Sequence, residues 1–235
     1  MLVFLIVVNF ADIFSSIITH KGSLFSVNKI ETSSYSVYGV SIKDYANEED
    51  ALNYANSVTN KGGAGYVYQS GEYFVLGNAY QSLNEATEIK ENLLKLGYNA
   101  RIVNIKVDAI CKTYRGNNSK SLTACLNWFR NCYNSLYEEG LNFDKNLSNR
   151  NQTNSCLANV LTSLAQLNIE LNSFKSAADK DIKNAVSPHF KACKELLENL
   201  LYNKDSDLIF SSKMKSVSIQ IVLHNKLVVK ALNEI

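Results

Sequence analysis

Two stretches of the chain alternate apolar and polar residues in the same way. The first runs from Tyr35 to Ile42 (YSVYGVSI) and the second from Tyr73 to Tyr80 (YFVLGNAY). Tyr, Val and Gly recur at matching positions of the two stretches with one constant offset (73 − 35 = 38). Alternation with a period of two predicts strands. Repetition at this spacing indicates a duplicated supersecondary unit.

Each predicted strand leads into an amphipathic helical pattern, then a glycine, then a second apolar run. The sequence predicts strands at about 34–41, 65–69, 73–79 and 100–106, and helices at about 47–60 and 82–96. Asn47 is the expected N-cap of the first helix. Ser82 with Glu85 has the spacing of a capping box at the start of the second. The predicted order is β-α-β-β-α-β, an α+β domain in which two helices cover one face of a four-stranded antiparallel sheet.

After Asp108 the apolar period changes from two to alternating steps of three and four. Four such series follow, and their spacing is typical of the seams of a helical bundle. The series are Leu122, Cys125, Phe129, Cys132, Leu136; then Leu157, Val160, Leu164, Leu167, Leu171, Phe174; then Val186, Phe190, Cys193, Leu197, Leu200; then Val217, Ile221, His224, Val228, Ala231. We expect a compact antiparallel bundle of four helices over residues 118–235. Oligomerisation through these seams is the alternative.

The segment from Met1 to Thr19 is strongly apolar, close to the length that spans a bilayer. Asp12 lies inside it, and no Lys or Arg precedes it. A cleaved signal peptide competes with an uncleaved anchor, but the positive n-region of a signal peptide is missing. The interpretation adopted is a transmembrane signal anchor over residues 1–20, followed by a polar linker over 21–33.

The doubled unit, over residues 34–107, resembles the SPOR domain (sporulation-related repeat), a bacterial peptidoglycan-binding module. That family repeats a strand of the form Y-x-V-x-V-G-x-F, then a helix with Ala on its buried face, then a glycine before the next strand. The residues that carry the resemblance are Tyr35, Val37, Tyr73 and Val75 in the strands and Ala51, Ala55 and Ala86 in the helices. The chain departs from the pattern at Tyr38, at Gly39-Val40 and at Gly77-Asn78.

The resemblance implies a ferredoxin-like domain whose open sheet face binds glycan strands of peptidoglycan that lack stem peptides. It also implies a single-pass cell-membrane protein, most of it extracytoplasmic, that acts at sites of division or sporulation.

Alternation along the strands divides their residues between the two faces of the sheet. Val37, Gly39, Val75 and Gly77 are expected to face the two helices. The other face would be open and is the expected glycan-binding site, made of Ser36, Tyr38, Val40, Tyr66, Tyr68, Phe74, Leu76, Asn78 and Arg101. An exposed aromatic patch of this kind usually marks a contact surface. The alternative is that the bundle, or another copy of the chain, packs on this face.

Composition narrows the class of partner. The formal net charge of the 235-residue chain is only +2, which weighs against a nucleic-acid footprint. The RNA-recognition motif shares the β-α-β-β-α-β order, but its glycine-aromatic consensus is absent from the third strand. The five cysteines form no C-x-x-C pair, and an odd number leaves at least one without an intramolecular partner. Most are expected to be buried apolar residues, with one disulfide as the alternative outside the cell.

No catalytic constellation stands out. His189 and Cys193 share a helix face, but two metal ligands without a third indicate a structural pair. His224 falls on a bundle seam. The glycines of KGGAG follow a helix and precede a strand, which indicates a turn rather than a phosphate loop. We therefore expect no catalytic residues, metal or other cofactor.

The resulting hypothesis is a non-catalytic, membrane-anchored cell-wall-binding protein that recognises peptidoglycan glycan strands and no nucleic acid. The rival is a membrane-tethered interaction or assembly factor. In that case the sheet face or the helical bundle would bind a protein partner, or a second copy of the chain.

Overall fold

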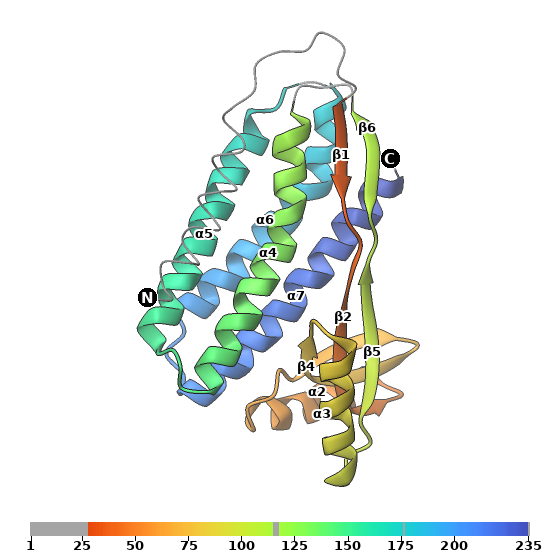
Figure 1. Cartoon of the computed structure of the whole chain (residues 1–235), viewed down its shortest axis with the longest axis vertical. Helices are drawn as coiled ribbons and strands as arrows, with labels where there is room; N and C mark the ends of the chain where they lie inside the picture. The colour runs from red at the N-terminus through yellow and green to blue at the C-terminus, as the bar shows by residue number, and fades with distance from the viewer. Residues whose placement is uncertain (1–27, 115–117, 176, 235) are drawn as a thin grey trace.

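The computed structural model describes residues 28–114, 118–175 and 177–234. An antiparallel sheet with two helices occupies one end of the molecule, and four long helices form the rest (Figure 1). The predicted signal anchor and residues 21–27 of the predicted linker lie outside the described residues. Within the described ranges, no helix is both long and apolar enough to cross a membrane.

The doubled unit folds as its sequence pattern predicts. Its four strands lie in the order β3-β4-β2-β5, and every neighbouring pair is antiparallel. Along the chain the elements alternate as β-α-β-β-α-β. Their bounds are β2 (Tyr35–Tyr45), α2 (Glu48–Thr59), β3 (Tyr66–Ser70), β4 (Glu72–Tyr80), α3 (Leu83–Lys95) and β5 (Arg101–Val107).

The two helix starts differ in how they are capped. The Asn47 side chain accepts a hydrogen bond from the backbone N–H of Asp50 at 2.9 Å, so the predicted N-cap of α2 is confirmed. The predicted capping box of α3 is wrong, because the Ser82 side chain makes no cap hydrogen bond. Glu85 instead accepts a hydrogen bond from the Tyr137 hydroxyl at 2.6 Å, which draws its carboxylate toward the helical bundle.

Two further strands extend the sheet beyond the predicted unit. Strand β1 (Asn28–Thr32) lies in the segment predicted to be a linker, and it pairs antiparallel with β6 (Ile110–Tyr114). Because β1 runs into β2 and β5 runs into β6, the neighbouring strands β2 and β5 continue as a two-stranded ribbon alongside the bundle (Figure 1). Helix α4 packs against β1. Residues 28–32 are therefore part of the folded structure rather than of a linker.

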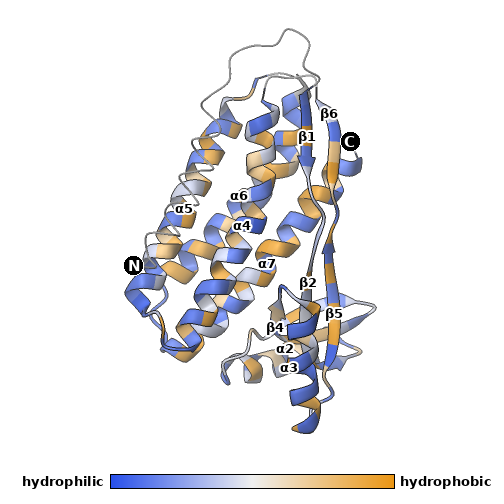
Figure 2. Cartoon of the chain, in the orientation of Figure 1, coloured by the Kyte–Doolittle hydropathy of each residue, from blue (hydrophilic) through white to orange (hydrophobic). Residues whose placement is uncertain are grey.

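The second half of the chain forms four long helices. They are α4 (Ser119–Asp144), α5 (Arg150–Ser173), α6 (Ala177–Leu201) and α7 (Asp207–Glu234). Each packs against two of the others, in the pairs α4–α5, α5–α6, α6–α7 and α4–α7. Hydrophobic and hydrophilic positions alternate around each helix, as amphipathic helices require (Figure 2).

The predicted seams form the centre of the bundle. Most of their members are buried, including Phe129 and Phe190, whose ring centroids lie 5.3 Å apart. All five cysteines are free thiols, and Cys125, Cys132 and Cys193 are buried as expected.

The sheet has no open face, because α7 and α4 pack on the side away from α2 and α3. Helix α7 contacts both β4 and β5, and the Asn225 side-chain amide donates to the Tyr35 hydroxyl at 3.0 Å. The Arg130 guanidinium of α4 lies 5.1 Å from the centre of the Tyr35 ring. Burial raises the pKa of Tyr35 to about 12, so its hydroxyl stays neutral. One hydrophobic core therefore runs from the sheet into the bundle.

The predicted division of residues between the two faces is partly wrong. The pairing of β2 with β4 shifts between Val40 and Ser41 and again between Ser41 and Lys43. Because directly paired residues share a face, these shifts place Ser41 beside Leu76 on the α7 side. They leave Val40 beside Asn78 on the α3 side.

The strand pairing corrects which face of the sheet each residue lies on. Val37 and Gly39 alternate with Tyr35 and face the bundle rather than the two short helices. A Cβ at Gly39 would lie 3.0 Å from the Leu76 side chain, which confirms that these two residues share a face. Val75 packs on α2 as predicted.

A polar contact ties the α2–β3 turn to the bundle. The Lys215 ammonium of α7 lies 2.7 Å from the Asp144 carboxylate and donates to the Gly62 carbonyl at 2.8 Å. The Lys215 side chain is only 14% exposed, so these contacts are poorly screened by solvent. The Ser212 hydroxyl, one turn earlier on α7, donates to the Thr59 carbonyl at 2.8 Å.

Replacing Lys215 by Ala is expected to lower the free energy of unfolding by about 2 kcal/mol, because it removes two charge-assisted contacts. The Lys213→Ala control removes a solvent-exposed pair with Asp205 and should cost much less, because water and salt screen exposed pairs. Urea unfolding followed by circular dichroism measures both. Equal effects of the two substitutions would contradict a docking role for Lys215.

Candidate functional site

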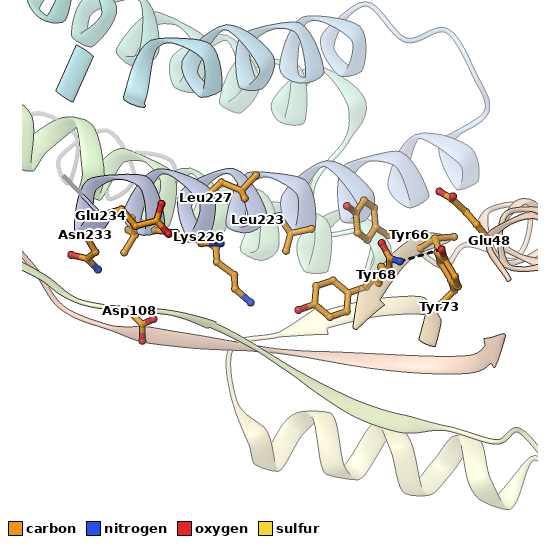
Figure 3. A pocket seen from close by; sticks show the side chains of 14 residues that line it. Glu48, Tyr66, Tyr68, Tyr73, Asp108, Leu223, Lys226, Leu227, Asn233 and Glu234 are labelled. Atoms are coloured by element: carbon orange, nitrogen blue, oxygen red, sulfur yellow. Dashed lines mark hydrogen bonds and ion pairs between the residues drawn. The ribbon is translucent and has the colours of Figure 1, made fainter. Parts of the chain in front are cut away.

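A groove of about 750 Å³ runs between α7 and the strands. Figure 3 shows α7 along one side and β3 with the long ribbon along the other. The lining residues come from α7, from β3 and β4, from the start of α2 and from the turn after β5. They are Glu48, Tyr66, Val67, Tyr68, Gln69, Tyr73, Asp108, Leu223, Lys226, Leu227, Val229, Lys230, Asn233 and Glu234.

The strand side of the groove carries the aromatic residues. Tyr66 and Tyr68 alternate along β3 and are paired with Leu76 and Phe74 of β4. Both tyrosines are half-buried, and in Figure 3 their rings lie beneath α7. Burial raises the pKa of Tyr66, so its hydroxyl is neutral and can both donate and accept hydrogen bonds.

The groove lining carries charges of both signs, and most of these charges are paired. Lys230 lies 3.9 Å from Glu234 on the same helix, and Asp108 pairs with Lys106 at 2.8 Å. In the described part of the chain, Lys226 has no ion-pair partner, and its side chain points from α7 toward the strands (Figure 3). The groove therefore offers hydrogen-bonding groups with little net charge.

The groove is elongated. Along α7 its lining extends from Leu223 to Glu234. The eleven steps between these two residues, at a rise of about 1.5 Å each, correspond to a length of about 16 Å. A site of this shape suits a segment of a polymer better than a single compact molecule.

The predicted site residues do not form one surface. Tyr66 and Tyr68 lie in the groove, but Leu76 is fully buried behind them and Phe74 is half-buried beside Tyr68. Arg101 is exposed at the end of the sheet, where it pairs with Asp44 at 3.0 Å and with Glu72 at 3.6 Å.

The remaining four residues lie on the opposite side of the sheet, toward α3. Val40 is buried there, Asn78 and Tyr38 are half-buried, and Ser36 alternates with Tyr38. Of the nine predicted residues, the structure brings only Tyr66 and Tyr68 into the groove.

Many of the groove residues that sequence reasoning missed come from α7, among them Leu223, Lys226, Leu227, Lys230 and Asn233. A signal for them exists in the sequence. Besides its predicted seam, α7 buries Ile219, Val222, Val229 and Leu232, so it is apolar on more than one side. A helix that is apolar around most of its circumference is expected to be covered on several sides.

Comparisons with known proteins give no assignment: no family model matches the chain, and neither the curated proteins nor the solved structures contain a match.

Two half-buried histidines meet between α6 and α7. The Nδ1 atoms of His189 on α6 and His224 on α7 lie 2.9 Å apart, a distance at which one ring must donate a proton and the other accept it. Burial lowers the pKa of both residues, and the proximity of His189 lowers the pKa of His224 further. Within the ranges that the structure describes, no three His, Cys, Asp or Glu residues gather as metal ligands.

The histidine pair predicts a loss of stability in acid. Below a pH of about 6.5 the unfolded chain binds protons at these residues more readily than the folded chain does. The free energy of unfolding should therefore fall as the pH drops through that value, and level off below the lowered folded pKa. Urea unfolding between pH 8 and pH 5 measures the slope. The His224→Gln variant should have a shallower slope, and an unchanged slope would contradict this role.

Proposed function

We propose that this chain is a non-catalytic cell-wall-binding protein, tethered to the cell membrane by its N-terminal segment. Its glycan site is the groove between α7 and β3, where a strand of peptidoglycan glycan would lie. The observation that carries the proposal is an elongated groove with two half-buried tyrosines on one side and polar side chains on the other.

The chemistry of the groove suits a sugar polymer. The face of a tyrosine ring stacks on the C–H groups of a pyranose, while its hydroxyl remains available for hydrogen bonds. Gln69, Asn233 and Lys226 add donors and acceptors along the same groove. Because most of the charges are already paired, the groove favours a largely uncharged chain over a polyanion such as a nucleic acid.

The strand order supports the resemblance to the SPOR domain in a modified form. The β-α-β-β-α-β order and the sheet order β3-β4-β2-β5 agree with the ferredoxin-like domain that the resemblance implies. The bundle covers the sheet face with which this family binds glycan. The site proposed for this chain is therefore at the edge strand β3. Helix α7 then has a defined role, since it forms the second wall of the groove.

In this proposal the groove faces the cell wall from an extracytoplasmic, single-pass protein. Binding to glycan strands without stem peptides would concentrate the chain where the wall is remodelled, at a division site or a forming spore. The bundle would be carried to the same place.

A specific observation favours the rival function of a protein-interaction or assembly factor. Leu227 is 51% exposed beside the groove, and β3 is an edge strand with one side unpaired in the sheet. An extended peptide could pair with that edge and place an apolar side chain against Leu227.

Co-sedimentation of the full chain with cell-wall sacculi separates the two functions. Sacculi are tested before and after an amidase removes the stem peptides. The glycan proposal predicts that the bound fraction rises after stripping and falls when soluble glycan fragments are added. Failure to bind either preparation would overturn the glycan proposal in favour of the interaction factor.

A further inference from the structure

A second cavity, of about 310 Å³, lies on the opposite side of the sheet from the groove, between α2 and α3. Its volume is at the lower end of the range for small-molecule sites. It is lined by Ile42, Tyr54, Ser57, Val58, Lys61, Gly62, Gly63, Gly77, Asn78, Tyr80, Ile89, Leu93, Tyr98 and Lys215.

Aliphatic side chains and bare backbone form much of the cavity wall. Ile42, Val58, Ile89 and Leu93 contribute the aliphatic groups. A Cβ added at Gly77 would lie 2.8 Å from Ile42 Cδ1, so no side chain fits at that position. This part of the cavity suits an apolar group.

Three backbone carbonyls next to the cavity already accept hydrogen bonds. The Val58 carbonyl accepts from the backbone N–H groups of Lys61 and Gly63, each at 3.0 Å. The Gly77 carbonyl accepts from the N–H of Ala64 at 2.6 Å. The Gly62 carbonyl accepts from the Lys215 ammonium. These three carbonyls are therefore not free to bind a ligand.

The charges that line the cavity are positive. Two lysines and no carboxylate belong to the lining. Lys215 is neutralised by Asp144 at 2.7 Å, whereas Lys61 is exposed and has no ion-pair partner among the residues that the structure describes. Tyr54 and Tyr98 line the same cavity, and a tyrosine hydroxyl can donate a hydrogen bond.

We propose that this cavity binds a small amphipathic carboxylate, with its alkyl chain against Ile42 and Ile89 and its carboxylate at the Lys61 ammonium. The argument rests on the apolar wall, the engaged backbone carbonyls and the uncompensated positive charge. It does not depend on the glycan groove, which lies on the other side of the sheet.

Titration of the full chain with octanoate tests the site, followed by NMR of its isoleucine δ1-methyl groups. Ile42 and Ile89 line the cavity, whereas Ile219 and Ile221 are buried in the bundle and serve as internal controls. Octanoate should shift the signals of Ile42 and Ile89 and leave the other two unchanged. Octanol, which lacks the carboxylate, should bind about tenfold more weakly.

Variants locate the two ends of the ligand. Lys61→Ala should weaken octanoate binding about tenfold, while Lys120→Ala, an exposed lysine at the start of α4, should leave it unchanged. Ser57→Leu should fill part of the cavity and weaken octanoate and octanol alike. The absence of shifts at Ile42 and Ile89, equal affinity for octanoate and octanol, or full affinity in Lys61→Ala would each overturn the proposal.

A parallel titration with dihexanoyl phosphatidylglycerol separates a free acid from a lipid head group. The proposal predicts weaker binding of this two-chain lipid, because a cavity of about 310 Å³ has room for little more than one chain. Tighter binding of the lipid would overturn the assignment to a carboxylate.

Discussion

Replacing Leu76 by Ala is expected to lower the free energy of unfolding by about 2–5 kcal/mol, the range for removing a large buried aliphatic side chain. Leu76 is fully buried on the sheet face that α7 covers, beside Ser41 and Tyr66. On an open face the same change would cost little, because a truncated exposed side chain leaves no cavity. Urea unfolding followed by circular dichroism measures the difference.

Leu96→Ala is the matched control, since that leucine is 74% exposed after α3. Its substitution should change the free energy of unfolding by less than about 0.5 kcal/mol. Similar small effects at both positions would mean that the bundle does not cover the sheet in solution.

Replacing Gly65 by Ala is expected to cost about 3 kcal/mol or more. Gly65 has φ +56°, and a Cβ there would lie 2.1 Å from Thr59 Oγ1 and 2.5 Å from the Ala55 carbonyl oxygen. The unfavourable left-handed conformation and the overpacking against α2 both contribute. Because Gly65 immediately precedes β3, the same change should displace Tyr66 at the end of the groove.

Gly71→Ala separates the two contributions. Gly71 has φ +78°, but a Cβ there would have no neighbour within 4 Å. This variant should lose only the conformational part, about 1–2 kcal/mol. Thermal unfolding of the two variants compares them directly, and equal losses would show that the turn before β3 is not tightly packed.

The repeat made the order of the elements predictable, because both copies show the same succession of an alternating strand, a helical pattern, a glycine and a second strand. It was harder to predict which residues lie on each face of the sheet. The repeat matches Tyr35 with Tyr73 and Ile42 with Tyr80, but β2 continues to Tyr45 whereas β4 ends at Tyr80. The pairing of these two strands skips Gly77 of β4 between Val40 and Ser41, and it skips Ile42 of β2 between Ser41 and Lys43. A shift of one residue moves a side chain to the other face, and alternation alone cannot locate it.

The groove could be predicted only in part, because its two walls are far apart in the sequence. Alternation along β3 identified Tyr66 and Tyr68 as neighbours on one face. Lys226 and Leu227 join them only because α7 packs between the sheet and the other bundle helices. The many apolar residues of α7 indicate a helix covered on several sides, but they do not identify the element that covers it.

The most direct test of the glycan groove compares two tyrosine variants of the full chain for binding to stripped sacculi. Tyr68 lies in the groove, and Tyr202, which is 74% exposed after α6, lies outside it. Removal of a stacking ring should weaken binding about tenfold or more in Tyr68→Ala, while Tyr202→Ala binds like the unmodified chain. Equal binding by both variants, with circular dichroism spectra unchanged, would contradict a glycan site between α7 and β3.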